Sequence, residues 1–157
     1  MENMLINQYG MLKDARSVLL NYCQTIPAAD FVQELKDFGR GSIRNLLVHT
    51  INAYEAWLGN FALAKNGTFT QASSVREAAD IIPAFDKTND LVHDFIRSFA
   101  GNYEKEIKGE IIKGKAVSTT PFTLFTHVLT HEFHHKGQIL SMGRHLGYLP
   151  PDTDVLR

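Results

Sequence analysis

The sequence is poor in cysteine, since Cys23 is the only one in 157 residues. An internal disulfide is therefore impossible, and nothing in the cysteine count indicates an oxidising compartment. Cys23 lies among apolar residues at helical spacing, a pattern that favours a buried, unreactive thiol over a nucleophile.

The chain also lacks an excess of charge of either sign. It has 16 lysines and arginines against 17 aspartates and glutamates, for a formal net charge of -1. Proteins that bind nucleic acids usually present a basic surface, so we expect no nucleic-acid partner. The basic residues between Lys105 and Lys115 are interleaved with glutamates, which is typical of a solvated face.

Long apolar runs are missing as well. No stretch approaches the roughly 18 apolar residues that are needed to span a bilayer. The first ten residues, MENMLINQYG, have neither the basic start nor the apolar run of a signal peptide. We therefore expect no membrane partner and a cytoplasmic location.

The composition that remains is that of an ordinary folded protein, with 44% hydrophobic and 21% charged residues. The length suits one domain with a proper core, and we see no internal repeat. We therefore expect residues 1–157 to form a single domain.

Two helical patterns occupy the first part of the chain. Apolar residues recur every seven positions from residue 5 to residue 26 and predict a long amphipathic helix, which Pro27 ends. Ser42 can cap a second helix whose apolar stripe extends to Phe61. The Asn66–Gly67 pair then predicts a turn.

The middle of the chain predicts a third helix. Ser74 and Glu77 have the spacing of a capping box, which predicts a short helical segment that extends to Pro83. Helical spacing returns from Phe85 to Phe99, so we expect this helix to be kinked or split at the proline.

The last third of the chain contains an ambiguous stretch and a clear helix. Isoleucines, a valine and glycines between residues 103 and 119 are compatible with either a small hairpin or an irregular loop. Thr120–Pro121 predicts the start of a fourth helix, which continues to about Leu146, where Gly147 follows.

Four amphipathic segments with almost no strand signal predict an all-α fold, in which the helices form a four-helix bundle with their apolar stripes facing one another. The long connection after the second helix indicates a non-sequential arrangement.

Histidine is the residue whose distribution is least random. Five of the seven histidines lie in the fourth predicted helix, namely His127, His131, His134, His135 and His145. Residues four apart share a helix face with Cβ atoms about 5–6 Å apart, so His131 and His135 can both bind one divalent ion.

Two imidazoles are too few for a tight site, and a facing helix of the bundle is the natural source of a third. His49 is the candidate, because it lies near the inward stripe of the second helix, where an unpaired imidazole would be costly to bury. Three histidines leave coordination positions open, as in catalytic metal centres. Such a site accepts zinc, nickel, copper or iron, and we expect zinc or nickel.

Other interpretations of these histidines stay open. His127 also lies one turn from the pair, but about 80° of helical rotation separates it from His135. His134 can compete with His135, and the pair can also exist without any metal. We expect His93 and His145 to be surface or hydrogen-bonded histidines.

The segment His131–His135 also reads as H-E-x-x-H, the helix of zinc proteases in which the glutamate is the general base. The extended form needs glycine and histidine where this chain has Gln138 and Ser141, and no glutamate follows, so we disfavour a protease. On a helix Glu132 points away from the His131 face, whereas Gln138 lies near His135 and can support it. We name no catalytic residue.

Two blocks of the sequence resemble the DinB/YfiT-like superfamily. The block HVLTHEFHHKGQILSMGRHLGYLPPDTDVL, His127 to Leu156, is similar to the last helix and tail of that family, where two histidines four apart precede a Gly-Gln-Ile run. The block SIRNLLVHTINAYEAWL, Ser42 to Leu58, is similar to its second helix. With the first helix, the resemblance spans essentially the whole chain.

The resemblance implies a four-helix bundle of up-down-down-up topology, often homodimeric, that holds a divalent metal on three histidines. Matched position by position, these are His49, His131 and His135. Members of the family include thiol-dependent transferases and isomerases, presumed metal-dependent hydrolases and many proteins with no assigned reaction.

These observations favour a metal-dependent enzyme, a hydrolase or a thiol-dependent transferase, that acts on a small-molecule substrate. In the transferase case a low-molecular-weight thiol is the second substrate. The alternatives are a non-catalytic metal-binding protein and a dimerisation module, and apolar residues exposed on the first helix would support the last of these.

Overall fold

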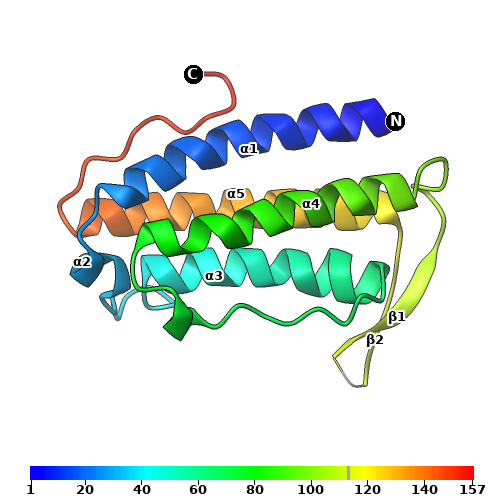
Figure 1. The fold of residues 1–157 in the computed structure, drawn as a ribbon, viewed down its shortest axis with the longest axis horizontal. Helices are drawn as coiled ribbons and strands as arrows, with labels where there is room; N and C mark the ends of the chain where they lie inside the picture. Colours follow the sequence, from blue (N-terminus) through cyan, green and yellow to red (C-terminus); the bar gives the residue numbers. More distant parts are fainter. Residues whose placement is uncertain (113) are drawn as a thin grey trace.

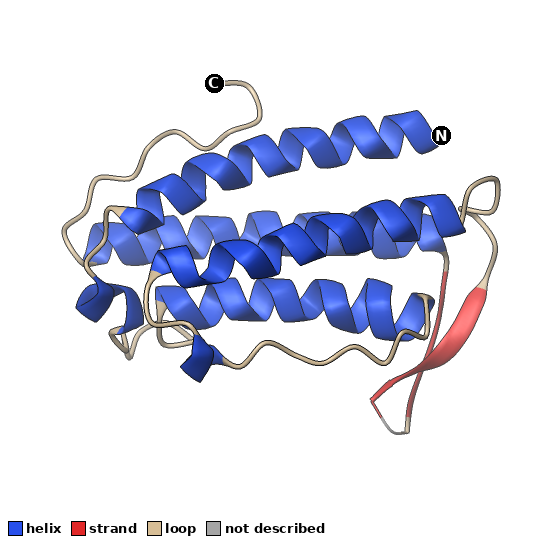
Figure 2. Cartoon of the chain, viewed as in Figure 1, coloured by secondary structure: helices blue, strands red, loops and turns tan. Residues whose placement is uncertain are grey.

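The computed structural model describes residues 1–112 and 114–157 and is mostly helical in that part of the chain (Figures 1 and 2). The long helices of the described residues lie side by side, and they are α1 (Glu2–Gln24), α3 (Ile43–Tyr54), α4 (Ile82–Ser98) and α5 (Pro121–His145). The predicted helical fold is confirmed.

The two helices that carry the candidate histidines begin as their caps predict. The Ser42 hydroxyl accepts a hydrogen bond from the Asn45 backbone N–H at 3.2 Å at the start of α3. The Thr120 hydroxyl accepts one from the Thr123 N–H at 3.2 Å, and Pro121 occupies the first turn of α5. These caps satisfy N–H groups that the helices leave free, so the start of each helix is set locally.

The segment that follows α1 differs from the prediction. Pro27 ends α1, but it also begins a short helix, α2 (Ala28–Val32), which lies between the first two predicted helices. The proline ring is compatible with both positions, because it cannot continue one helix and is tolerated at the beginning of the next.

The predicted capping box at Ser74 and Glu77 is wrong. Ser74 lies in the one-turn segment η2 (Ala72–Ser74), where its hydroxyl donates to the Gln71 carbonyl oxygen at 2.7 Å. Glu77 precedes another such segment, η3 (Ala78–Ile81), and makes no capping hydrogen bond there.

Of the two forms expected at Pro83, a kink or a split, the structure has the split. The short segment η3 ends at Ile81 and α4 begins at Ile82, with Pro83 in its first turn, where its missing N–H would have had no partner within the helix. The proline therefore begins the helix instead of bending it.

The helix that carries His49 continues as a π-helical segment, η1 (Glu55–Ala62), and so ends next to Phe61, as its apolar stripe predicts. Its end is fixed by Asn60, whose side-chain oxygen accepts from the Gly67 N–H at 2.6 Å. The chain then returns along the bundle, so that α3 and α4 begin at the same end (Figure 1).

The ambiguous stretch before α5 is a hairpin. The strands β1 (Ile107–Ile112) and β2 (Lys115–Thr119) pair antiparallel, with Ile107 opposite Thr119. The expected all-α fold is therefore wrong for this segment. The hairpin forms because β-branched residues favour strands and because Gly114, with a φ of +82°, adopts a turn conformation that favours glycine. In the predicted solvated face Lys105, Lys108 and the glutamates are exposed, while Lys113 lies outside the described residues.

The bundle interior consists of two groups of buried apolar side chains. One includes Leu19, Ile43 and Ile139, and the other includes Leu5, Val92 and Phe125. Each such side chain contributes about 1.5–3 kcal/mol when fully buried. Cys23 is fully buried in the first group, as predicted, and burial raises its pKa to about 12, which argues against a nucleophile.

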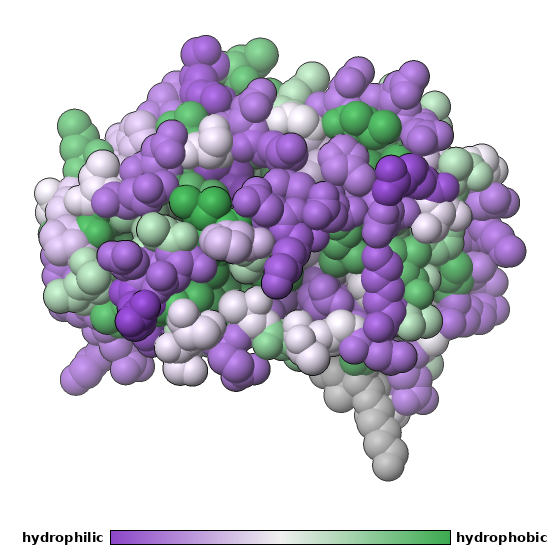
Figure 3. Space-filling view, in the orientation of Figure 1, coloured by the Kyte–Doolittle hydropathy of each residue, from purple (hydrophilic) through white to green (hydrophobic). Residues whose placement is uncertain are grey.

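The surface of the view in Figure 3 is mostly hydrophilic, with smaller apolar areas between the polar side chains. None of the helices in the described ranges is long and apolar enough to cross a membrane.

Candidate metal centre

Three histidines from two helices converge on one face of the bundle. His49 comes from α3, and His131 and His135 come from consecutive turns of α5, which packs against α3. One ring nitrogen of each histidine lies within 4.8 Å of the others. Among the described residues, these three side chains therefore form a group that could hold a metal ion. The prediction that His49 meets the pair is confirmed in its geometry.

The two histidines of α5 already have the spacing of metal ligands. Their Nε2 atoms are 3.1 Å apart. Two nitrogens that each lie 2.0–2.1 Å from one ion are about 2.9–3.4 Å apart for angles between octahedral and tetrahedral. The His49 ring is close to both, with centroid distances of 4.9 Å to His131 and 4.8 Å to His135.

Gln138 sets the protonation of His135. Its side-chain oxygen accepts a hydrogen bond from His135 Nδ1 at 2.7 Å, which leaves the Nε2 lone pair directed at the site. Metal-binding histidines commonly have such a partner on the second nitrogen. The predicted proximity of Gln138 to His135 is confirmed by this contact.

The polar environment of His131 is incomplete. Its Nδ1 atom is buried and has no hydrogen-bond partner among the described residues. Burial, followed by the neighbouring histidines, lowers the pKa of His131 to about 4, so the ring is neutral near pH 7. A neutral imidazole is the form that binds metal ions.

His49 has a charged neighbour instead. The Arg40 guanidinium donates from Nη2 to His49 Nε2 at 3.3 Å. Burial and this positive charge lower the pKa of His49 to about 4, and burial also lowers the pKa of His135. All three rings are therefore neutral donors at pH 7.

The residues fit a divalent ion. They supply three neutral imidazoles at suitable spacing, and the His135 ring is already oriented by an amide. Cavities of about 230 Å³ and 480 Å³ adjoin the site, one lined in part by His135 and the other by His49. The arrangement leaves room for a small molecule beside the imidazoles.

The other histidines do not join the group. By ring centroids, His127 packs edge-on at 5.0 Å from Trp57 and lies 5.8 Å from His131, and the exposed His134 lies 5.0 Å from His135. His93 packs edge-on against Tyr9, and His145 is exposed, as expected.

Glu132 has a structural environment that sequence reasoning missed. Both of its carboxylate oxygens accept from the Arg16 guanidinium of α1, at 2.7 and 2.8 Å, and the Tyr54 hydroxyl donates to it at 2.7 Å. Burial and the Glu132 charge raise the pKa of Tyr54 well above its usual value. A carboxylate held this way cannot act as a base at the histidines, which argues against the protease interpretation.

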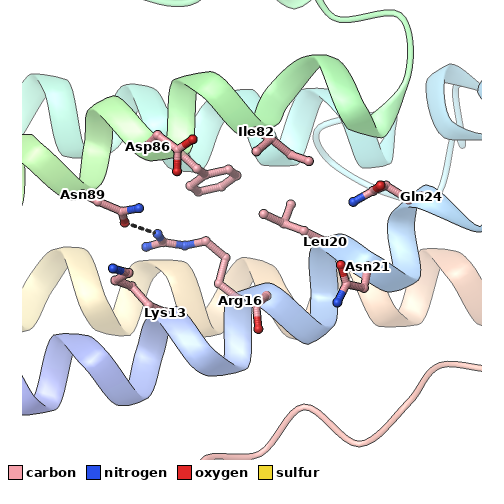
Figure 4. Close-up of a pocket in the computed structure, with 10 residues that line it drawn as sticks. Lys13, Arg16, Leu20, Asn21, Gln24, Ile82, Asp86 and Asn89 are labelled. Carbon is pink, nitrogen blue, oxygen red and sulfur yellow. Dashed lines mark hydrogen bonds between the residues drawn. The ribbon is translucent and has the colours of Figure 1, made fainter.

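One signal for this ion pair was present in the sequence. Arg16 is a charged residue within the apolar stripe of α1, between Leu12 and Leu19, and it is only 4% exposed. Its guanidinium also donates to Asn89 of α4 at 2.8 Å, where a cavity of about 320 Å³ lies between α1 and α4 (Figure 4). The side chain therefore ties three helices together.

Comparison with protein families identifies the chain. The model of the DinB family matches residues 1–157, so the protein belongs to the DinB family. Comparison with curated proteins gives no match.

Proposed function

We propose that this DinB family member is a metal-dependent enzyme, a hydrolase or a thiol-dependent transferase, that acts on a small-molecule substrate. His49, His131 and His135 are the proposed ligands, and zinc or nickel is the proposed ion. The observation that carries the proposal is the convergence of three neutral imidazoles within 4.8 Å, beside cavities that can admit a substrate.

When bound, a divalent ion at this place supplies Lewis acidity and lowers the pKa of a water molecule or a thiol. The chain's own groups prepare for it: Gln138 keeps the His135 proton on Nδ1, and burial keeps the rings neutral. Because Glu132 is bound by Arg16 and Tyr54, we assign it no proton transfer.

In the transferase case the thiol must come from outside the protein. Cys23 is fully buried in the core and its pKa is raised to about 12, so it cannot supply a thiolate at neutral pH. This supports a low-molecular-weight thiol as the second substrate.

The experiment that tests the proposal is elemental analysis of tag-free protein. We expect one divalent ion per chain in the wild type, little in His49→Ala and His135→Ala, and a wild-type content in the control His93→Ala. Unchanged metal in both ligand variants would remove the assigned ligands. Turnover of thiols with electrophiles, or of hydrolysable esters and amides, then separates an enzyme from a non-catalytic metal-binding protein.

A second candidate role is dimerisation, and it rests on a different observation. Met4 and Met11, seven residues apart on α1, are 67% and 52% exposed. Apolar side chains in a line on one helix are typical of an interface between copies. Sedimentation velocity of the wild type and of Met4→Glu, Met11→Glu tests it, with a dimer expected for the wild type and a monomer for the double variant.

We extend the proposal to the architecture that the family resemblance implies, a single domain of up-down-down-up topology. The return of the chain between η1 and α4, which starts α3 and α4 at the same end, supports this order (Figure 1).

A further inference from the structure

Arg40 lies beside the histidines on a fixed stretch of backbone. Its carbonyl oxygen accepts from the Asn45 side-chain amide at 3.0 Å and from the Ser42 N–H at 3.0 Å, immediately before α3. Its side chain is exposed and reaches His49, to which it donates at 3.3 Å. The backbone is therefore anchored while the guanidinium is free to exchange its partner.

The same residue lines both cavities next to the site. One contains Arg40 with His135 and Gln138, and the other contains it with His49 and Asn52. Among the described residues that line them, neither cavity has an aspartate or a glutamate. In the described part of the chain, no carboxylate forms an ion pair with Arg40.

The polar groups around Arg40 are mostly committed to the protein. The Asn52 side chain donates to the Thr70 carbonyl oxygen at 2.9 Å and accepts from the Thr70 N–H at 2.8 Å. Gln138 is engaged by His135. Arg40 is thus the side chain of this region that can turn a charged group toward a ligand in either cavity.

The charge balance of the site indicates what that ligand is. Three neutral imidazoles leave the charge of a divalent ion uncompensated, and Arg40 adds a further positive charge within hydrogen-bond distance of one of them. A guanidinium beside a cation is stable when an anion lies between them, and its planar fork matches the two oxygens of a carboxylate or a phosphate.

We propose that Arg40 is a substrate-positioning residue that binds a carboxylate or phosphate group of a small anionic substrate next to the three histidines. The inference rests on the proposed function, because it assigns the substrate class of the same site. Cavities of about 230 and 480 Å³ restrict the substrate to a small molecule.

The test is a calorimetric titration of the full-length, zinc-loaded protein, at constant ionic strength, with acetate and with methylphosphonate. Zinc content is measured before and after each titration. We expect Arg40→Ala to weaken binding of the preferred anion at least tenfold, and Arg40→Lys to have an intermediate effect because lysine keeps the charge but loses the fork. The preferred probe identifies the anionic group as carboxylate or phosphate.

Arg44→Ala is the matched control. Arg44 is a cation on the first turn of α3 that donates to Asn45 at 3.2 Å and does not line either cavity. Its removal should change anion affinity by less than about twofold, since it alters net charge without touching the ligand.

Zinc affinity in the absence of anions gives an independent readout. Arg40→Ala removes a positive charge and the N–H that competes for His49 Nε2, so zinc should bind at least threefold more tightly. Weaker zinc binding would mean that Arg40 only supports the metal site and would overturn the proposal. A wild type that takes up no zinc overturns the proposed function together with this inference, whereas equal anion binding by zinc-loaded wild type and Arg40→Ala overturns the inference alone.

Discussion

His131 and Glu132 are neighbours in the chain, and the 100° of helical rotation between them places their side chains on different faces of α5. On one side, the His131 Nε2 atom lies 3.1 Å from that of His135, and its buried Nδ1 atom has no hydrogen-bond partner among the described residues. On the other side, Glu132 has both oxygens occupied by Arg16 and a third hydrogen bond from Tyr54. One face of the helix presents imidazole nitrogens that a metal ion can bind, and on the other the carboxylate has its partners within the protein.

The difference shows how one helix combines a reactive site with a rigid support. A buried charge that is paired and hydrogen-bonded holds α1, α3 and α5 in one arrangement, because any slip would leave that charge unpaired. The histidines then keep their relative positions without strong bonds between them.

Breaking the Arg16–Glu132 pair should have the largest effect. Arg16→Met leaves the Glu132 carboxylate without its partner, and removal of one member of a buried pair typically costs about 3–5 kcal/mol. Urea unfolding of the metal-free protein measures this loss. Ser17→Ala, an exposed neighbour on α1, should stay within about 0.5 kcal/mol; a similarly small loss for Arg16→Met would show that the pair does not hold the bundle.

Filling the histidine site should stabilise the protein by a smaller amount. A ligand at 100 times its Kd raises the free energy of unfolding by about 2.7 kcal/mol, so saturating zinc should do so in the wild type. His49→Ala should lose most of this gain and His93→Ala should keep it. Equal stabilisation of wild type and His49→Ala by zinc would contradict the three-histidine site.

The support of His135 can be weakened without removing a ligand. Gln138→Ala deletes the acceptor of the Nδ1 proton, and loss of such a contact typically reduces metal affinity 10–100-fold. A competition titration with a chromophoric chelator measures it. Ser141 is exposed on the next turn, so the control Ser141→Ala should leave zinc affinity unchanged. Equal zinc affinities of the two variants would argue against a role for Gln138.

The smallest expected effect is that of moderate acid on zinc binding. The pKa values of His49 and His131 are lowered to about 4, so both rings stay neutral as the pH falls from 7 to 5.5 and take up protons only as it approaches 4. Zinc affinity should therefore change less than about tenfold over that range, whereas three histidines with an ordinary pKa near 6.5 would lose about a thousandfold. Competition titrations at each pH distinguish the two.

Much of this molecule follows from local pattern. The starts of α3 and α5 were predicted from Ser42 and Thr120, because a capping hydrogen bond joins residues only a few positions apart. The errors arise where tertiary packing overrules such a local pattern. Ser74 and Glu77 have the spacing of a capping box, but Val75, Ala78 and Ile81 are buried in the bundle core, and the chain forms two separate short turns there instead of one helix.

The candidate site also has some contacts that local pattern predicts and others that it does not. The spacing of His131 and His135 on one helix determines by itself that their rings are neighbours, since one turn separates them. Whether His49 reaches them, and whether Arg16 meets Glu132, depends on the rotation and register of separate helices, which no single segment encodes. Those contacts arise only when the apolar stripes of α1, α3 and α5 pack together, and so tertiary structure alone decided which face of α5 is left open and which is closed.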